Sequence, residues 1–167
     1  PVGGNPSKAK ETAGPRIMAV TSGKGGVGKT SFSANLAVSL AREGKRVIIF
    51  DADLGLANAE ILMGVTPPVT LYDCINGRAE MQDLLVPGPE GVQLLSGGSG
   101  FMELANLEGK VLQGIMDSLQ ALDNEADFII VDTAAGITKS VLAFVASVEE
   151  IVLVITPEPT SITDAYC

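Results

Sequence analysis

The sequence predicts an α/β protein, a three-layer sandwich in which helices cover both faces of a mostly parallel sheet. Short apolar runs alternate along the chain with segments whose apolar residues recur every three or four positions, which is the period of a helix. Several of the short runs are apolar at consecutive positions, as expected of strands that helices cover on both sides. This alternation favours right-handed βαβ units and places ligands at the carboxyl ends of the strands.

The strands are expected at apolar runs bounded by polar residues, glycine or proline. These runs are Arg16–Val20, Arg46–Phe50, Val92–Leu95, Phe128–Val131 and Ile151–Ile155. The third run gives the weakest signal, whereas the second, fourth and fifth are expected to be buried on both faces.

In the segments between these runs, the apolar residues recur at the spacing of a helix. The expected helices are Lys29–Arg42, Leu107–Leu122 and Val141–Val148, with shorter helices within residues 56–86. Gly44 is a natural stop for the first of them. Residues 1–15, with their prolines and glycines, are interpreted as a flexible lead-in, and residues 16–167 as one folded domain.

The last residues resemble the beginning of a helix. Thr160–Asp164 is a typical helix start, with Ser161 and Asp164 spaced as a capping box. The sequence stops at Cys167, within the first turn, and a helix that short has no stability of its own. We therefore expect a domain that is truncated at its C-terminus.

Composition and charge exclude several classes of function. The chain has no histidine, which excludes catalytic triads and metal sites that depend on that side chain. Cys74 and Cys167 have no metal-binding spacing, which favours a reducing, cytoplasmic setting. Residues 1–46 carry 8 basic and 2 acidic side chains, whereas residues 47–167 carry 3 and 18. This distribution does not favour binding to nucleic acid, but it allows a local anion site in the first third of the chain.

One motif predicts what that anion is. Residues 23–30 read GKGGVGKT and fit G-x-x-x-x-G-K-[ST] between an expected strand and an expected helix, as in a P-loop NTPase. In such a loop the backbone N–H groups surround phosphate oxygens, Lys29 neutralises the β- and γ-phosphates, and the Thr30 hydroxyl ligates Mg²⁺. We therefore predict ATP and Mg²⁺ as ligands. The predicted nucleotide-binding residues are Gly23, Lys24, Gly25, Gly26, Val27, Gly28, Lys29, Thr30 and Ser31.

Three aspartates at expected strand ends support this site. Asp132 follows a buried strand, which is the position of the aspartate on the Mg²⁺ side of a P-loop enzyme. Asp51 and Asp53 end the strand after the P-loop helix. If that strand continues to Asp53, both carboxylates point to the same side, where they can orient water or hold Mg²⁺ through water. The predicted metal-binding set is Thr30, Asp51 and Asp132.

These motifs resemble those of a known family. Lys24 directly after the first glycine, the sequence Asp51-Ala52-Asp53 and the segment Asp132–Gly136 are similar to the deviant-Walker-A ATPases of the MinD/ParA family. Residues 51–58, 132–137 and 159–166 resemble one branch, the MinD-like ATPases that regulate flagellar number and placement in bacteria. The resemblance extends from Arg16 to Tyr166.

The resemblance implies roles that spacing alone does not assign. In such proteins the lysine that matches Lys24 reaches across a dimer interface to the partner's nucleotide, and the aspartate that matches Asp53 positions the attacking water. Lys24, Lys29 and Asp53 are then the catalytic residues. Residues 54–58 become the first switch and Asp132–Gly136 the second. The family dimerises face to face around ATP and separates after hydrolysis.

The resemblance also implies partners and a location. It implies a regulatory partner protein, such as a flagellar GTPase, for an ATP-dependent homodimer in the cytoplasm. Family members often carry a C-terminal amphipathic helix that binds the inner face of the membrane, and that segment lies outside this sequence. The N-terminal motif by which flagellar regulators stimulate a partner GTPase is not recognisable in residues 1–15.

Two other functions within the same superfamily stay open. An iron–sulfur cluster carrier shares the lysine-bearing loop but needs thiolates, of which this sequence has two, far apart. A DNA-partition ATPase needs basic surface, which the acidic region after residue 46 does not supply. Spectra after iron reconstitution, and a salt-dependent shift of DNA in the presence of ATP, distinguish these alternatives from the dimerisation switch.

Overall fold

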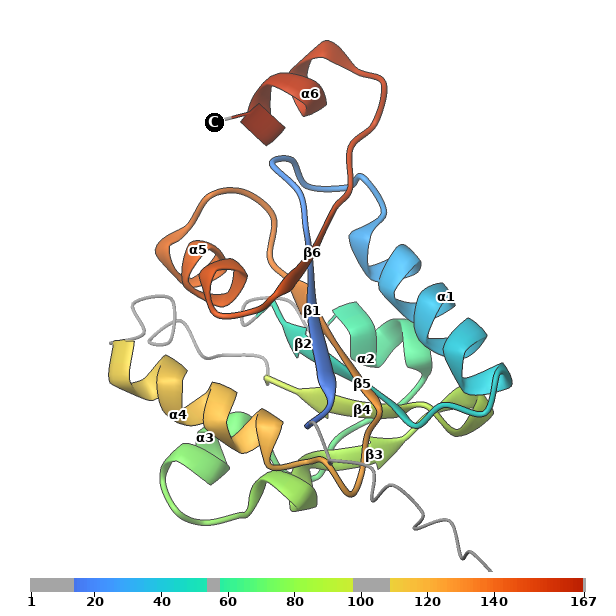
Figure 1. Cartoon of the computed structure of the whole chain (residues 1–167), viewed down its shortest axis with the longest axis vertical. Coiled ribbons are helices and arrows are strands. Elements are labelled where there is room, and N and C mark those ends of the chain that lie inside the picture. Colours follow the sequence, from blue (N-terminus) through green and yellow to red (C-terminus); the bar gives the residue numbers. More distant parts are fainter. Residues whose placement is uncertain (1–13, 54–57, 98–108, 167) are drawn as a thin grey trace, which may run out of the picture.

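The computed structural model describes residues 14–53, 58–97 and 109–166, and Figure 1 shows a sheet with helices on both faces. The strands are β1 (Arg16–Thr21), β2 (Val47–Ala52), β3 (Leu85–Pro87), β4 (Gln93–Ser96), β5 (Phe128–Thr133) and β6 (Glu150–Leu153). The helices are α1 (Lys29–Arg42), α2 (Asn58–Met63), α3 (Leu71–Ile75), α4 (Gly109–Gln120), α5 (Lys139–Ala146) and α6 (Pro159–Tyr166), with 3₁₀ turns η1 (Met81–Leu84) and η2 (Pro89–Gly91).

The strands are ordered β3-β4-β2-β5-β1-β6 across the sheet, which confirms the predicted three-layer architecture. All neighbouring strands are parallel except β3, which pairs with β4 in the antiparallel sense. The antiparallel strand was not predicted, because it is only three residues long and ends in Pro87. Proline is tolerated there because an edge strand has one side without ladder hydrogen bonds.

The consecutive apolar residues of the central strands divide between two cores. On β2, Ile48 and Phe50 face the side covered by α3, α4 and α5, whereas Val47 and Ile49 face the side covered by α1 and α2. Figure 1 shows the helices on these two sides of the sheet. On the α4 and α5 side, the rings of Phe50 and Phe144 meet edge to face with their centroids 5.7 Å apart. The prediction of burial on both faces is thus confirmed for β2.

The same prediction is wrong for the last strand. Ile151, Leu153 and Ile155 were expected to be buried, yet each is about half exposed, at 51%, 48% and 52%. One side of this segment, with Val152 and Val154, packs on the core. Ile151 and Leu153 alternate with Val152 on β6, which lies at the edge of the sheet beside β1, and Ile155 lies beyond the end of that strand. Within the described residues no helix is long and apolar enough to cross a membrane.

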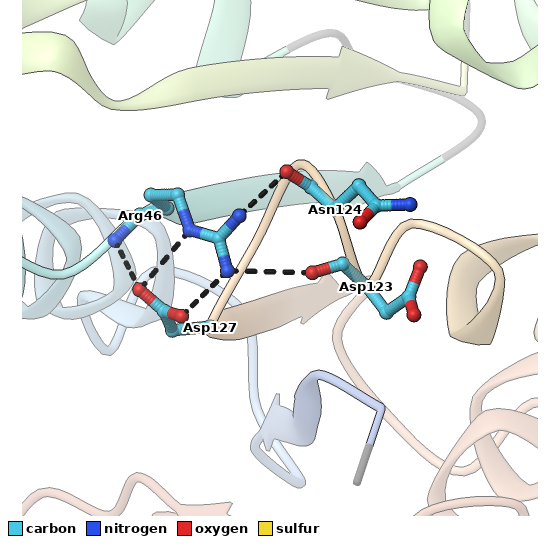
Figure 2. Close-up of polar contacts among 4 residues, drawn as sticks. All are labelled: Arg46, Asp123, Asn124 and Asp127. Atoms are coloured by element: carbon cyan, nitrogen blue, oxygen red, sulfur yellow. Dashed lines mark hydrogen bonds and ion pairs between the residues drawn. The ribbon is translucent and has the colours of Figure 1, made fainter. Parts of the chain in front are cut away.

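Hydrogen bonds and an ion pair of Arg46 stabilise the register of β2 against β5, at the end of the sheet where both strands begin. Figure 2 shows the Arg46 guanidinium donating to Asp127 and to the backbone carbonyls of Asn124 and Asp123. The Arg46 backbone N–H also donates to Asp127, at 2.8 Å. These bonds hold the pKa of Asp127 at about 2. In this register, Asp51 lies directly opposite Asp132 at the other end of the two strands.

Candidate functional site

The loop between β1 and α1 opens onto a cavity of about 600 Å³ at the carboxyl edge of the sheet. Of the predicted nucleotide-binding residues, those that line the cavity are Gly25, Gly26, Gly28, Lys29, Thr30 and Ser31. Gly23, Lys24 and Val27 are not among the lining residues. The rest of the wall comes from Asp53, from α2, from the last residue of β5 and from Ala135.

Gly28 allows the loop to turn into α1. Its φ of +96° lies in the left-handed region, which side chains with a Cβ rarely adopt, and it is the N-cap residue of the helix. No side chain of the described residues forms a capping hydrogen bond at this end of α1. The first N–H groups of the helix are therefore left for a ligand, and the helix dipole favours an anion there.

Lys29 is the first residue of α1, and only 8% of it is exposed. Its Nζ donates a hydrogen bond to Ser22 Oγ at 2.9 Å. Burial lowers the pKa of Lys29, and the charges of Asp132 and Asp53 oppose that shift. A buried ammonium that lines a cavity is a suitable counterion for a phosphate group.

Asp132 lies at the end of β5 and is 2% exposed. Burial raises its pKa, against the effect of hydrogen bonds from the Thr30 and Ser33 hydroxyls. The Ser33 contact, at 3.1 Å, was not foreseen, although its position on the buried face of α1 gave a signal. Thr30 and Asp132 are thus neighbours, which is the pairing that a P-loop needs for Mg²⁺. Within residues 14–53, 58–97 and 109–166 no three acidic or cysteine side chains form a metal cluster, so Mg²⁺ would need phosphate and water oxygens as well.

Asp51 has a different place from the one that strand alternation suggested. Since β2 ends at Ala52, the alternation stops before Asp53. The two carboxylate oxygens of Asp51 accept hydrogen bonds from the backbone N–H groups of Ala59, at 2.9 Å, and Asp53, at 3.0 Å. Burial raises the pKa of Asp51 to about 7. Asp51 holds the start of α2 in this structure, and its role as a metal ligand stays a prediction.

Asp53 is half-buried and lines the cavity together with Asn58. The Asn58 side-chain amide donates to Asp53 Oδ2 at 3.4 Å. The remainder of the expected first switch, residues 54–57, lies outside the described residues. Asp53 therefore lines the cavity, and its role in positioning the attacking water stays a prediction.

Lys24 points away from the cavity and toward α6 of the same chain. Its Nζ is 2.7 Å from Glu158 Oε2 and donates to Thr160 Oγ1 at 3.2 Å. Hydrogen bonding and the charge of Glu158 raise the pKa of Lys24. Gly23 lies so close to α6 that a Cβ there would collide with the backbone of Asp164. Figure 1 shows α6 beside the loop that precedes α1.

The capping box predicted for α6 is not formed as expected. The helix begins at Pro159, and Ser161 lies buried within it, where its Oγ accepts a hydrogen bond from the Thr156 N–H at 3.1 Å. Ser161 therefore stabilises the turn between β6 and α6 through this hydrogen bond and is not the N-cap residue.

The segment predicted as the second switch, Asp132–Gly136, starts at the end of β5. Thr133 and Ala135 line the cavity, and the Gly136 N–H donates to the Ser22 carbonyl at 2.9 Å. Ser22 was not among the predicted site residues, because the motif begins one position later. The cavity also includes Ile61 and Leu62 on α2, which are apolar yet exposed and which the sequence did not distinguish from core residues.

Comparisons with known proteins are consistent with this geometry. The sequence model of the ParA family, described as NUBPL iron-transfer P-loop NTPase, matches residues 15–166. The antiactivator FleN of Pseudomonas aeruginosa is 48% identical over 151 residues, which cover 90% of this chain and 54% of FleN. The flagellum site-determining protein YlxH of Helicobacter pylori is 41% identical over 152 residues, 90% of this chain and 51% of YlxH.

Solved structures agree with the fold. The septum site-determining protein MinD of Pyrococcus horikoshii, complexed with Mg-ADP, superposes with a TM-score of 0.78 at 33% identity. The superposition covers 90% of this chain and 62% of that protein. The chain thus spans about half the length of the curated relatives it matches.

Proposed function

Because the chain belongs to the ParA family of P-loop NTPases, we propose that it is the nucleotide-binding part of a MinD-like ATPase that regulates flagellar number or placement. The observation that carries this proposal is the cavity, onto which the loop glycines, Lys29, Thr30 and Asp53 all open. The similarity to YlxH, which is named a flagellum site-determining protein, supports the flagellar process.

The residues present fit ATP and Mg²⁺. The uncapped start of α1 and the buried Lys29 ammonium suit the phosphates, and the Thr30 hydroxyl beside Asp132 suits the metal. The metal would neutralise charge on the phosphate oxygens. A relative with 33% identity was solved with Mg-ADP, which supports the same ligands here.

For hydrolysis, Asp53 orients the attacking water, a role supported by its place in the cavity wall and by the hydrogen bond that it accepts from Asn58. Lys29 neutralises charge that develops on the phosphates. Lys24 contributes from the second copy in an ATP-dependent homodimer, so in each copy it has to leave Glu158 before it reaches the partner's nucleotide.

A regulatory partner protein, such as a flagellar GTPase, binds the ATP-bound dimer. The proposal also includes a cytoplasmic location, with attachment to the inner face of the membrane through a segment outside this sequence. The similarity to FleN, which is named an antiactivator, supports a partner protein, whereas the location and the membrane attachment rest on the resemblance to the MinD-like ATPases.

Light scattering on the full-length protein tests the switch. With Mg-ATP we expect a dimer that returns to monomer as ATP is consumed, whereas Mg-ADP gives monomer throughout. Asp53→Ala should bind ATP and stay dimeric, because it removes the group that orients water and not one that binds ground-state phosphate. A mass that is the same with ATP and ADP would contradict the proposal.

An iron–sulfur carrier remains the second candidate, because the matching family model is described as an iron-transfer NTPase. Cys74 is the free cysteine of the described part of the chain, and Cys167 lies outside it. Cys74 is half-buried, and burial raises the pKa of its thiol, which disfavours the thiolate that a cluster needs. Visible absorbance after iron reconstitution of the full-length protein would favour this candidate.

A further inference from the structure

Ser22 lies directly after β1, where it contacts three parts of the site. Its Oγ accepts the hydrogen bond from Lys29 Nζ, and its own hydroxyl donates to the Lys24 backbone carbonyl at 2.7 Å. Its carbonyl accepts the N–H of Gly136 in the second switch. Ser22 is 2% exposed, so water does not compete for these bonds.

The direction of the hydroxyl proton follows from this arrangement. A serine hydroxyl has one proton to donate and two lone pairs that accept. The Lys24 carbonyl takes the proton, because a carbonyl can only accept, and the lone pairs therefore face Lys29. The Lys29 ammonium can only donate, so the chain of bonds runs in one sense, from Lys29 through Ser22 to the Lys24 backbone.

This chain of bonds restrains an otherwise flexible side chain. Among the described residues, Ser22 Oγ is the hydrogen-bond acceptor of Lys29 Nζ. One N–H of the ammonium is thereby fixed, and tetrahedral geometry turns the other two away from Ser22, while the side chain lines the cavity. The bond thereby restricts the rotamers of Lys29, which reduces the side-chain entropy lost when a phosphate group binds.

We propose that Ser22 is a positioning residue for nucleotide binding, which holds the Lys29 ammonium in the phosphate cavity through its Oγ acceptor. This inference rests on the proposed function, because it requires that the cavity binds nucleotide. It assigns the effect to the acceptor lone pairs, and not to the support that the same hydroxyl gives to the loop at Lys24.

Two substitutions separate these roles in the full-length protein. Ser22→Ala removes both the acceptor and the donor. Ser22→Cys keeps a side chain of similar shape whose S–H still donates weakly to Lys24, but sulfur is a poor acceptor for an ammonium. A half-buried serine on α4 supplies the control, Ser118→Ala, which also removes one hydroxyl bond, to the Gly114 carbonyl, outside the site.

Calorimetry with Mg-ADP and steady-state ATP hydrolysis are the measurements, after melting curves have confirmed that each variant is folded. We expect both Ser22 variants to bind ADP about ten-fold more weakly, because a hydrogen bond to a charged group is lost. The KM for ATP rises by the same factor, kcat stays within about two-fold, and Ser118→Ala behaves as the native protein. If Ser22→Ala does not fold, Ser22→Cys carries the test.

Native-like ADP affinity in the folded Ser22→Cys variant would overturn the inference, because the donor role alone would then suffice. A failure of the native protein to bind ADP would instead contradict the proposed function, so the two failures are distinguishable.

Discussion

Asp51→Asn should change how the stability of the protein depends on pH. Burial raises the pKa of Asp51 in the folded state to about 7, from 3.8 in a solvated carboxyl. Below the lower value both the folded and the unfolded chain hold the proton. As pH rises from there to about 7, the unfolded chain releases the proton first, so the folded state loses stability over that window.

The size of the effect follows from the shift. About three pKa units, at about 1.4 kcal/mol each, give a cost of about 4 kcal/mol at neutral pH and above. Between about pH 5 and pH 8 the native protein should lose about 2–3 kcal/mol of this, whereas asparagine does not titrate. The variant also has one acceptor oxygen for the N–H groups of Ala59 and Asp53, a loss of about 1–3 kcal/mol that does not vary with pH in this range.

The informative quantity is therefore the slope of the free energy of unfolding against pH, and not its value at one pH. Urea unfolding without nucleotide and with a chelator, from about pH 5 to pH 8, should show Asp51→Asn gaining about 2–3 kcal/mol relative to the native protein. The control is Asp127→Asn, which should show no such trend because Asp127, with a pKa of about 2, is ionised across the whole range. If the difference in unfolding free energy between Asp51→Asn and the native protein does not change with pH, or changes in the opposite direction, the raised pKa of Asp51 is refuted.

Two further predictions concern binding and packing. Lys29→Ala should weaken Mg-ADP binding about a hundred-fold or more by calorimetry, because it removes the cation that lines the phosphate cavity, whereas exposed Lys45→Ala should bind as the native protein does. Phe144→Ala should lower the free energy of unfolding by about 3–5 kcal/mol in urea titrations, because it leaves a cavity beside Phe50. Leu142→Ala, on the exposed face of the same helix, should cost much less, and equal losses would contradict this account of the core.

The sequence predicted best where a local pattern decides the structure. The run Val47–Phe50 is apolar throughout because both faces of β2 are covered, and the glycine motif has its form because the chain turns sharply between β1 and α1. The prediction of buried side chains failed at the edge of the sheet. Periodicity reports which residues are apolar, but the exposure of Ile151 depends on which strands lie beyond it.

The site was predicted in part for a related reason. Lys29, Thr30 and Asp53 belong to motifs, and all three line the same cavity. The contact of Asp51 with the start of α2, and that of Lys29 with Ser22, depend on where the chain returns in space. No spacing in the sequence encodes such contacts, so a three-dimensional structure was needed to find them.

The ion pair between Lys24 and Glu158 has a consequence for how two copies associate. If Lys24 moves to a phosphate of the partner's nucleotide, one ion pair is exchanged for another, since the bond to Glu158 is broken first. Added salt weakens both pairs, so its effects on the two partly cancel. Dimerisation should then respond less to ionic strength than the number of charges at the interface suggests. Glu158→Gln removes the compensation, and light scattering over a series of salt concentrations should show a steeper loss of dimer.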